Sequence, residues 1–346
     1  METRCIIRYR VVLRSVVFFL VACLLQTTGQ VNALAQTPAS ARTSEPGVPK
    51  DKSAAPVERS QDAVPADHFD PDDQKTYADV VSEERAVTIR GRQFKLHLYR
   101  PRASGAATPA IYACGDGGWR GLAPRTAQQL AHMGFAVAGV DSKVYLRELS
   151  SAQAPLTIKQ LAQDYATMAQ VVRETAQAGK TAPVYIYGWS VGAGFAVAVG
   201  SDADTRSNWA GIISIGLPSQ NQLVSGVAGN KVDLKTGANA RYGFRTERII
   251  GAISPLPLVM IQSTTDTASP QKVGKLLFAA ARDPKQYVLI KADNHRFSGA
   301  REEFYAALSG AMTWIREART SSRGGTQTAG AQNTANSAAA RPEGRQ

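Results

Sequence analysis

The sequence predicts an α/β fold in which helices cover both faces of a mostly parallel central sheet. Two observations support this prediction: short apolar runs alternate with helical stretches, and one of these runs leads directly into a glycine-flanked serine. With the polar, low-complexity ends set aside, about 240 residues remain, which suits one domain with a full core.

The domain is expected to open with an antiparallel pair of strands at an edge of the sheet. Apolar residues alternate with polar ones, first at Val87 and Ile89 and then at Phe94, Leu96 and Leu98, as in strands that bury one face. The later strands are continuous apolar runs, which is typical of strands buried on both faces. These runs cover residues 110–114, 184–187, 210–215, 256–262 and 286–290.

Two longer helices are predicted from apolar residues at helical spacing. The first stripe consists of Leu161, Tyr165, Met168 and Val172, and the second of Phe304, Leu308, Met312 and Ile315. We expect both stripes to pack against the core of the domain.

The most informative segment is the G-x-S-x-G turn from Gly188 to Gly192, with Ser190 at its centre. Chance gives such a pentapeptide in about one chain in ten of this length, so its surroundings matter more than the motif. A buried strand precedes the turn, and a helix of small residues, 192–199, follows it. Strand, sharp turn and helix form a nucleophile elbow, which predicts an α/β-hydrolase fold and a nucleophilic Ser190.

A serine hydroxyl needs a general base to act as a nucleophile at neutral pH. The chain has four histidines, and His295 is the one that follows a predicted sheet strand in the last third of the chain. His68 lies in a low-complexity segment, His97 within a strand and His132 within a helix. We therefore predict His295 as the base.

The base in turn needs an acid that fixes its tautomer. Asp266 follows the strand 256–262 and leaves 29 residues for one helix and one strand before His295, so we predict that it is the acid. A helix cap is the alternative role for Asp266. The other candidate acid is Asp293, which is better placed to hold its own loop.

Charge that develops on a carbonyl oxygen during ester cleavage requires preorganised N–H donors. Val191 follows the nucleophile and is one predicted donor. The glycine-rich loop 115–120 follows the strand 110–114, and Asp116 and Gly117 are its predicted oxyanion-hole residues. An ordinary tight turn before a helix is the alternative for this loop.

The chain resembles the AcvB/VirJ family of periplasmic α/β-hydrolase-like proteins between about Val87 and Arg319. The G-D-G-G-W loop together with G-V-D-S is the most specific part of the resemblance. The matching residues are Gly115 to Trp119, Gly139 to Ser142 with Tyr145 shortly after, Gly188 to Ala193, Asp266 and His295.

The resemblance implies hydrolysis of the aminoacyl ester of lysyl-phosphatidylglycerol by a serine nucleophile. Trp189, Val191 and Gly194 depart from the family pattern around the elbow, where Gly194 replaces an acidic residue. An acid near the serine would discriminate a substrate that carries ammonium groups.

Four residues are candidate substrate contacts. Asp116 and Asp141 are the acids, and Trp119 and Trp189 are the aromatic residues beside the loop and the serine. Hydrogen bonding within its own loop is the alternative for either aspartate.

The first 35 residues read as a secretory signal peptide. Four arginines precede the apolar run 16–25, and Ala33-Leu34-Ala35 is a small-x-small cleavage site. We therefore expect a periplasmic protein, with lipidation at Cys23 as the less favoured alternative. A polar disordered linker is predicted at 36–78, the hydrolase domain at 79–319 with a possible lid or substrate loop at 219–254, and a disordered tail at 320–346.

The formal net charge is +12, and removal of residues 1–35 leaves 36 basic and 27 acidic residues. This balance suits a peripheral contact with an anionic membrane. We predict no cofactor, no metal and no nucleic acid partner, because the chain lacks metal-ligand spacing, a phosphate-binding loop and aromatic residues interleaved with its basic ones. A general carboxylesterase or acyltransferase, and a non-catalytic virulence-type binding protein on the same fold, are the alternative functions.

Overall fold

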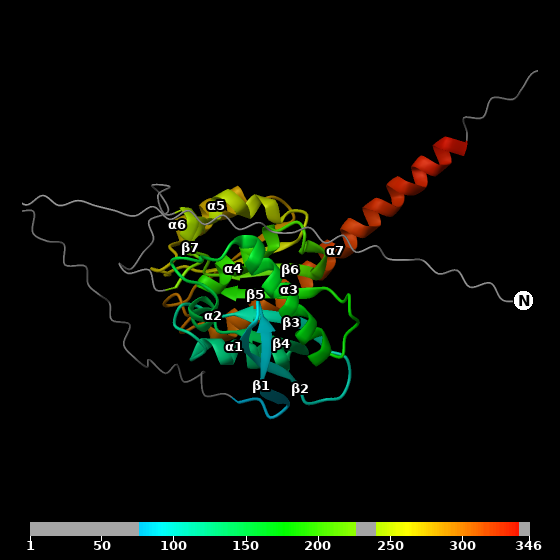
Figure 1. Cartoon of the computed structure of the whole chain (residues 1–346). Coiled ribbons are helices and arrows are strands. Elements are labelled where there is room, and N and C mark those ends of the chain that lie inside the picture. The colour runs from blue at the N-terminus through cyan, green and yellow to red at the C-terminus, as the bar shows by residue number, and fades with distance from the viewer. Residues whose placement is uncertain (1–75, 226–239, 339–346) are drawn as a thin grey trace, which may run out of the picture. The chain divides into compact units, whose positions relative to one another are not determined.

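The computed structural model describes residues 76–225 and 240–338 (Figure 1). The predicted signal peptide, Cys23, nearly all of the predicted linker and the centre of the 219–254 segment lie outside these residues. Within the described part, no helix combines the length and the apolar character needed to cross a membrane.

An eight-stranded sheet forms the centre of the domain, in the order β1-β2-β4-β3-β5-β6-β9-β10. β1 pairs antiparallel with β2, and β2 pairs antiparallel with β4, while the other pairs are parallel. The prediction of a mostly parallel sheet with an antiparallel edge pair is confirmed. The strands are β1 Val80–Ile89, β2 Arg92–Pro101, β3 Thr108–Ala113, β4 Phe135–Val140, β5 Val184–Trp189, β6 Trp209–Ile215, β9 Leu258–Ser263 and β10 Lys285–Ile290.

Helices cover both faces of this sheet (Figure 1). Neighbouring residues of one strand point to opposite faces, so Ile111 of β3 packs in one hydrophobic cluster and Tyr112 in the other. The Ile111 side holds α2, α3 and α4, and the Tyr112 side holds α1 and α7. The helices are α1 Leu122–His132, α2 Ser142–Leu149, α3 Ile158–Thr175, α4 Val191–Ser201, α5 Thr246–Ile249, α6 Gln271–Ala280 and α7 Arg301–Ala338.

Both predicted core stripes are confirmed. Leu161, Tyr165, Met168 and Val172 of α3 are fully buried, as are Phe304, Leu308 and Ile315 of α7, while Met312 is partly buried. The α3 helix starts with a capping box in which Thr157 and Gln160 bond reciprocally, which satisfies two donors that a helix start leaves open.

The structure differs from the predicted tail, because α7 continues to Ala338. Residues 320–338 contain no proline. Once the first half of α7 is packed on the domain, each further residue that joins the helix adds one backbone hydrogen bond. Residues 339–346 lie outside the described part.

The described ends of the 219–254 segment are folded rather than loop-like. Strands β7 Gln220–Gln222 and β8 Gly243–Arg245 form a small antiparallel sheet, followed by α5. Leu223 and Phe244 are buried there, so these ends belong to the body of the domain.

Close packing of β5 against α4 depends on Gly188. A Cβ at this position would overlap the carbonyl group of Gly192. We expect Gly188→Ala to lower the free energy of unfolding by about 3 kcal/mol or more, because backbone cannot move aside as a side chain can. Thermal and urea unfolding would measure the change.

Gly310 is the matched control, since a Cβ there meets nothing within 4 Å in the α7 helix. Gly310→Ala should be neutral or stabilising by up to about 1 kcal/mol, as alanine favours helix. Equal stability of the two variants would contradict the packing argument.

Candidate active site

Ser190 sits on a strained turn between β5 and α4. Its φ is 56° and its ψ is −117°, a conformation that residues with a Cβ rarely adopt. Gly188 packs against Gly192, and a Cβ on Gly192 would overlap the carbonyl group of Ala113 in β3. The sharp turn predicted between a strand and a helix is therefore present, and it lies at the carboxyl end of β5.

His295 lies in the loop between β10 and α7. The loop closes on itself through the Asp293 N–H, which donates to the Ser298 carbonyl over 2.9 Å. Trp189, the neighbour of Ser190, donates its indole N–H to the His295 carbonyl over 3.2 Å, and the two rings lie 5.4 Å apart. The residue before the serine thus supports the histidine loop directly.

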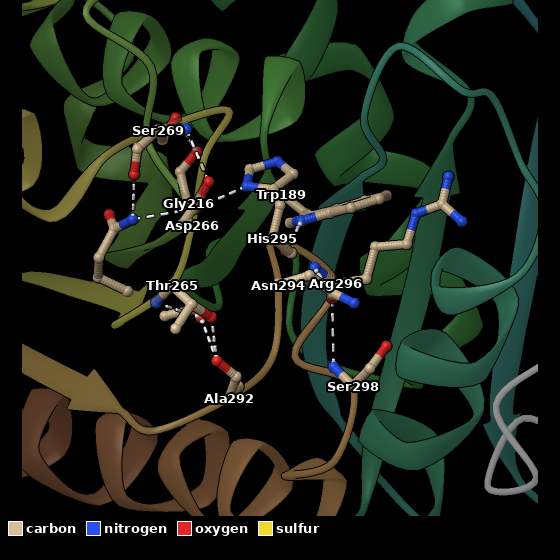
Figure 2. Close-up of polar contacts among 12 residues, drawn as sticks. Trp189, Gly216, Thr265, Asp266, Ser269, Ala292, Asn294, His295, Arg296 and Ser298 are labelled. Carbon is tan, nitrogen blue, oxygen red and sulfur yellow. Dashed lines mark hydrogen bonds and ion pairs between the residues drawn. The ribbon is translucent and has the colours of Figure 1, made fainter. Parts of the chain in front are cut away.

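Asp266 is the carboxylate that pairs with His295. Its Oδ2 lies 2.6 Å from His295 Nδ1, and its side chain is fully shielded from solvent (Figure 2). Asp293, the alternative acid, is exposed and belongs to the turn of its own loop. A carboxylate against Nδ1 favours the tautomer in which Nδ1 carries the proton and Nε2 can accept one.

Ser190 and His295 both lie against the end of β6. The Ser190 N–H donates to the carbonyl of Ile215 over 2.9 Å, and a Cβ on the next residue, Gly216, would lie 2.6 Å from His295 Cε1. Among the residues that the structure describes, His295 Nε2 is buried without a hydrogen-bond partner. The nitrogen that can accept a proton is therefore open, in a loop that the neighbour of Ser190, Trp189, contacts.

The loop after β3 touches the serine. A Cβ on Gly115 would lie 3.2 Å from Ser190 Cβ. The bonds that shape the loop use the N–H groups of Gly118 and Arg120, which donate to Gly115 and Gly118 carbonyls, and the N–H of Trp119. The predicted donors Asp116 and Gly117 come directly after Gly115.

Helix α4 leaves the Val191 N–H for a ligand. The next N–H, that of Gly192, already donates to the Cys114 carbonyl over 3.1 Å. Val191 is the first residue of α4, where the N–H has no acceptor within the helix. This arrangement fits the oxyanion-hole role predicted for Val191.

The two candidate acids differ in how they are used. Asp141 caps α2 by accepting from the N–H groups of Lys143 and Val144, each over 3.0 Å, and it accepts the Trp119 N–H over 3.1 Å. Asp141 thus follows the alternative reading and holds the loop that precedes α1. Asp116 is exposed, and the structure gives its carboxylate no ion pair among the described residues.

Both tryptophans predicted as substrate contacts are held by the protein. The Trp119 ring stacks on His97 at 4.8 Å with an interplanar angle of 2° and donates its N–H to the Tyr99 hydroxyl. Trp189 is buried, with 8% of its surface exposed. Trp189 therefore positions the His295 loop, and Trp119 anchors the loop after β3 to the sheet.

The remaining described histidines pair with other carboxylates. His97 in β2 faces Glu84 at 3.4 Å, and burial lowers its pKa despite this carboxylate. His132, at the end of α1, pairs with Asp79 at 2.8 Å.

Two residues near Asp266 were not singled out from the sequence. Gln262, at the end of β9, donates to Asp266 Oδ2 over 3.0 Å. The Ser269 N–H donates to Oδ1 over 2.7 Å (Figure 2). The sequence signal for Gln262 is a polar residue directly after the apolar run Leu258 to Ile261. Gln262 is 1% exposed, which is uncommon for a glutamine.

Asn221 accounts for the unusual Gly194. A Cβ on Gly194 would overlap Asn221 Oδ1, and Asn221 is held by donating to the Thr246 hydroxyl over 2.8 Å. The space beside α4 at Gly194 is therefore filled by Asn221 of β7.

Within the described residues, no group of three or more His, Cys, Asp or Glu side chains is placed to hold a metal ion. Cys114 is buried, and burial raises the pKa of its thiol to about 12. Such a thiol stays protonated and unreactive at neutral pH.

The comparison with protein families agrees with this geometry. The model for "Bacterial virulence protein (VirJ)" matches residues 107–221. This segment is similar to the VirJ family. It holds the loop after β3, Asp141 and the Ser190 elbow, and it ends before Asp266 and His295. The resemblance to the AcvB/VirJ family seen in the sequence is confirmed.

Curated relatives cover less of the chain. "Uncharacterized protein YfhR" of Salmonella typhi is 32% identical over 98 residues, which is 28% of this chain and 33% of that protein. The protein of the same name from Salmonella typhimurium gives the same identity and coverage. The match thus spans about a third of the length of these relatives.

Solved structures show the fold. A putative dienelactone hydrolase from Klebsiella pneumoniae is 14% identical, covers 68% of this chain and 98% of its own, and has a TM-score of 0.51. Est1E from Butyrivibrio proteoclasticus is 14% identical, covers 68% of this chain and 99% of its own, and also has a TM-score of 0.51. The VirJ-family segment therefore lies within an α/β-hydrolase fold.

The different roles of Asp141 and Asp116 predict different effects on the free energy of unfolding. Asp141→Ala removes a helix cap and the acceptor of the Trp119 N–H, so we expect the free energy of unfolding to fall by about 2 kcal/mol. Chemical denaturation would measure it.

Asp116→Ala is the matched control. Its carboxylate is exposed, so the change should stay within about 0.5 kcal/mol. A loss at Asp116 as large as that at Asp141 would argue against this division of roles.

Proposed function

We propose that this protein is a periplasmic serine esterase that cleaves the aminoacyl ester of lysyl-phosphatidylglycerol with Ser190, His295 and Asp266. The observation that carries the proposal is the 2.6 Å contact between Asp266 and His295, which leaves Nε2 of the same ring buried and without a partner among the described residues. The VirJ-family match and the hydrolase fold support the reaction class. The predicted signal peptide supports the compartment.

The proposed reaction proceeds through an acyl-enzyme. Ser190 Oγ attacks the ester carbonyl carbon while His295 Nε2 takes the hydroxyl proton. The intermediate collapses, the bond to the alcohol oxygen breaks, and the alcohol leaves with that proton. Water then attacks the lysyl-serine ester, gives a proton to His295 and releases lysine, and the proton returns to Ser190.

Charge stabilisation comes from two sides in this proposal. The N–H of Val191 and an N–H of the loop at Asp116 or Gly117 would bind the oxyanion, each donor contributing about 3 to 4 kcal/mol. Asp266 would stabilise the imidazolium that forms when His295 holds the proton.

The exposed charged side chains in the loops of Gly115 and His295 suit a substrate that carries both positive and negative charges. Asp116 is exposed in the loop that touches Ser190 and could pair with the lysyl ammonium groups. Arg120, whose Nε lies 3.9 Å from a Cβ placed on Gly117, and Arg296, next to His295, are exposed and have no ion pair among the described residues. Guanidinium groups suit the phosphodiester.

The surface also offers a contact for an anionic membrane. Leu276 on α6 is 63% exposed, and the exposed Lys272 and Lys275 lie on the same face of the helix. Apolar and cationic side chains together favour a negatively charged lipid surface.

The proposed function predicts lysine release from lysyl-phosphatidylglycerol vesicles. Ser190→Ala should lower kcat by at least about a thousandfold, since it removes the nucleophile. Amino-acid analysis of the vesicle supernatant would measure it, with a p-nitrophenyl ester assayed in parallel.

Ser214→Ala is the control, because Ser214 is buried in β6 and its hydroxyl has no described hydrogen bond. It should keep wild-type rates. Hydrolysis of the p-nitrophenyl ester alone would retain the esterase and exclude the lipid substrate. Inactivity on both would favour the binding-protein alternative.

Recognition of the ammonium groups predicts a selectivity change at Asp116. Asp116→Asn should lower kcat/KM for a soluble lysyl ester about tenfold more than for an uncharged ester of the same alcohol, because a charge-assisted contact is lost. Steady-state kinetics at two salt concentrations would measure the ratio. Asp204→Asn, an exposed acid that pairs with Lys159, should leave the ratio unchanged, and equal losses on both esters at Asp116 would exclude this role.

A further inference from the structure

A buried glutamine lies against the acid of the proposed triad. Gln262 is the penultimate residue of β9, and 1% of its surface is exposed. Burying an amide without partners costs several kcal/mol in an apolar setting, so its hydrogen bonds decide whether it is tolerated.

Both N–H bonds of the Gln262 amide point to oxygen acceptors. Nε2 donates to Asp266 Oδ2 over 3.0 Å and to the Ser269 carbonyl. A carboxylate and a carbonyl accept but do not donate, so these partners fix which end of the amide is the nitrogen. The amide therefore faces Asp266 in one orientation.

Asp266 receives three donors in this arrangement. Gln262 and His295 share its Oδ2, at 3.0 Å and 2.6 Å, while the Ser269 N–H reaches Oδ1 at 2.7 Å. Hydrogen bonds of this kind favour the ionised carboxylate. The Ser269 hydroxyl donates to the Gly216 carbonyl over 3.1 Å, which ties this group to the residue that contacts the His295 ring.

We propose that Gln262 is a positioning residue that holds Asp266 as an ionised acceptor and thereby sets the orientation and the basicity of His295. The inference rests on the proposed function for its kinetic consequences. An amide donates at every pH in this range and cannot take a proton from Asp266. Because it shares Oδ2 with His295, it also limits how strongly the carboxylate stabilises the imidazolium.

Other titratable groups near the pair keep one charge state or lie at the surface. The Tyr287 hydroxyl in β10 and the Gln262 amide oxygen lie against the same glycine, Gly274. Burial, followed by the charge of Asp266, raises the pKa of the Tyr287 phenol, so this group stays neutral. Asp293 and Arg296, in the His295 loop, are exposed. Gln262 is thus the uncharged donor through which the acid is tuned.

Two substitutions separate the hydrogen bond from the volume of the side chain. Gln262→Met keeps the volume and removes the donor, and Gln262→Glu keeps the shape and adds a negative charge against Asp266. We expect the midpoint of the acid limb of kcat/KM to move to higher pH by about half a unit in Gln262→Met and by more in Gln262→Glu. We also expect kcat to fall about tenfold or more while KM changes little.

The His295 imidazole is also followed by NMR titration of the full chain, which needs no turnover. A midpoint that moves to higher pH in Gln262→Met and further in Gln262→Glu supports the inference even if no ester is hydrolysed. The titration therefore distinguishes failure of this inference from failure of the proposed function. Ser263→Ala is the control, because the Ser263 hydroxyl donates to the Ala292 carbonyl before the His295 loop and accepts the Thr265 N–H, and it makes no described hydrogen bond to Asp266. Midpoints that stay at the wild-type value, move to lower pH, or shift equally in Ser263→Ala would overturn the inference.

Discussion

The crossing of β5 and α4 is the constraint on which the rest of the site depends. Ser190 holds a positive φ only because the chain must turn sharply between a buried strand and a buried helix. That turn requires backbone to pack directly on backbone, at Gly188 against Gly192 and at Gly192 against Ala113 of β3. The surrounding sheet supplies the rigidity that such a strained residue needs.

The sheet then brings separate loops to the same edge. In a parallel sheet the carboxyl ends of the strands lie together, so loops after β3, β5, β6, β9 and β10 share one edge. Gly115 reaches the serine from one side, while Gly216 and His295 meet beside it. Loops that are far apart in the sequence lie side by side, because the order of strands in the sheet determines which loops are neighbours.

Asp266 and His295 are held in place by several contacts besides the one between them. Asp266 is shielded from solvent and bonded by three donors, and the His295 loop is braced by Trp189 and by its own internal turn. Burial strengthens each of these hydrogen bonds and makes any unpaired partner costly. The one buried nitrogen of this pair left open in the described residues, His295 Nε2, is the one that the proposed chemistry uses.

The sequence by itself determined the fold class, the elbow at Ser190 and the pairing candidates Asp266 and His295. Strand and helix periods depend on local burial, and the turn needs its own glycines, so both are visible in a linear pattern. The tertiary structure decided what each polar side chain does. It assigned Asp141 to a helix cap and left Asp116 exposed, filled the space at Gly194 with Asn221, and brought Gln262 against Asp266. The Trp119–Asp141 and Gly194–Asn221 contacts join residues distant in sequence, which no local pattern encodes. The cap at Asp141 and the Gln262–Asp266 bond are short in sequence, but the residue types alone left open which donor meets which acceptor.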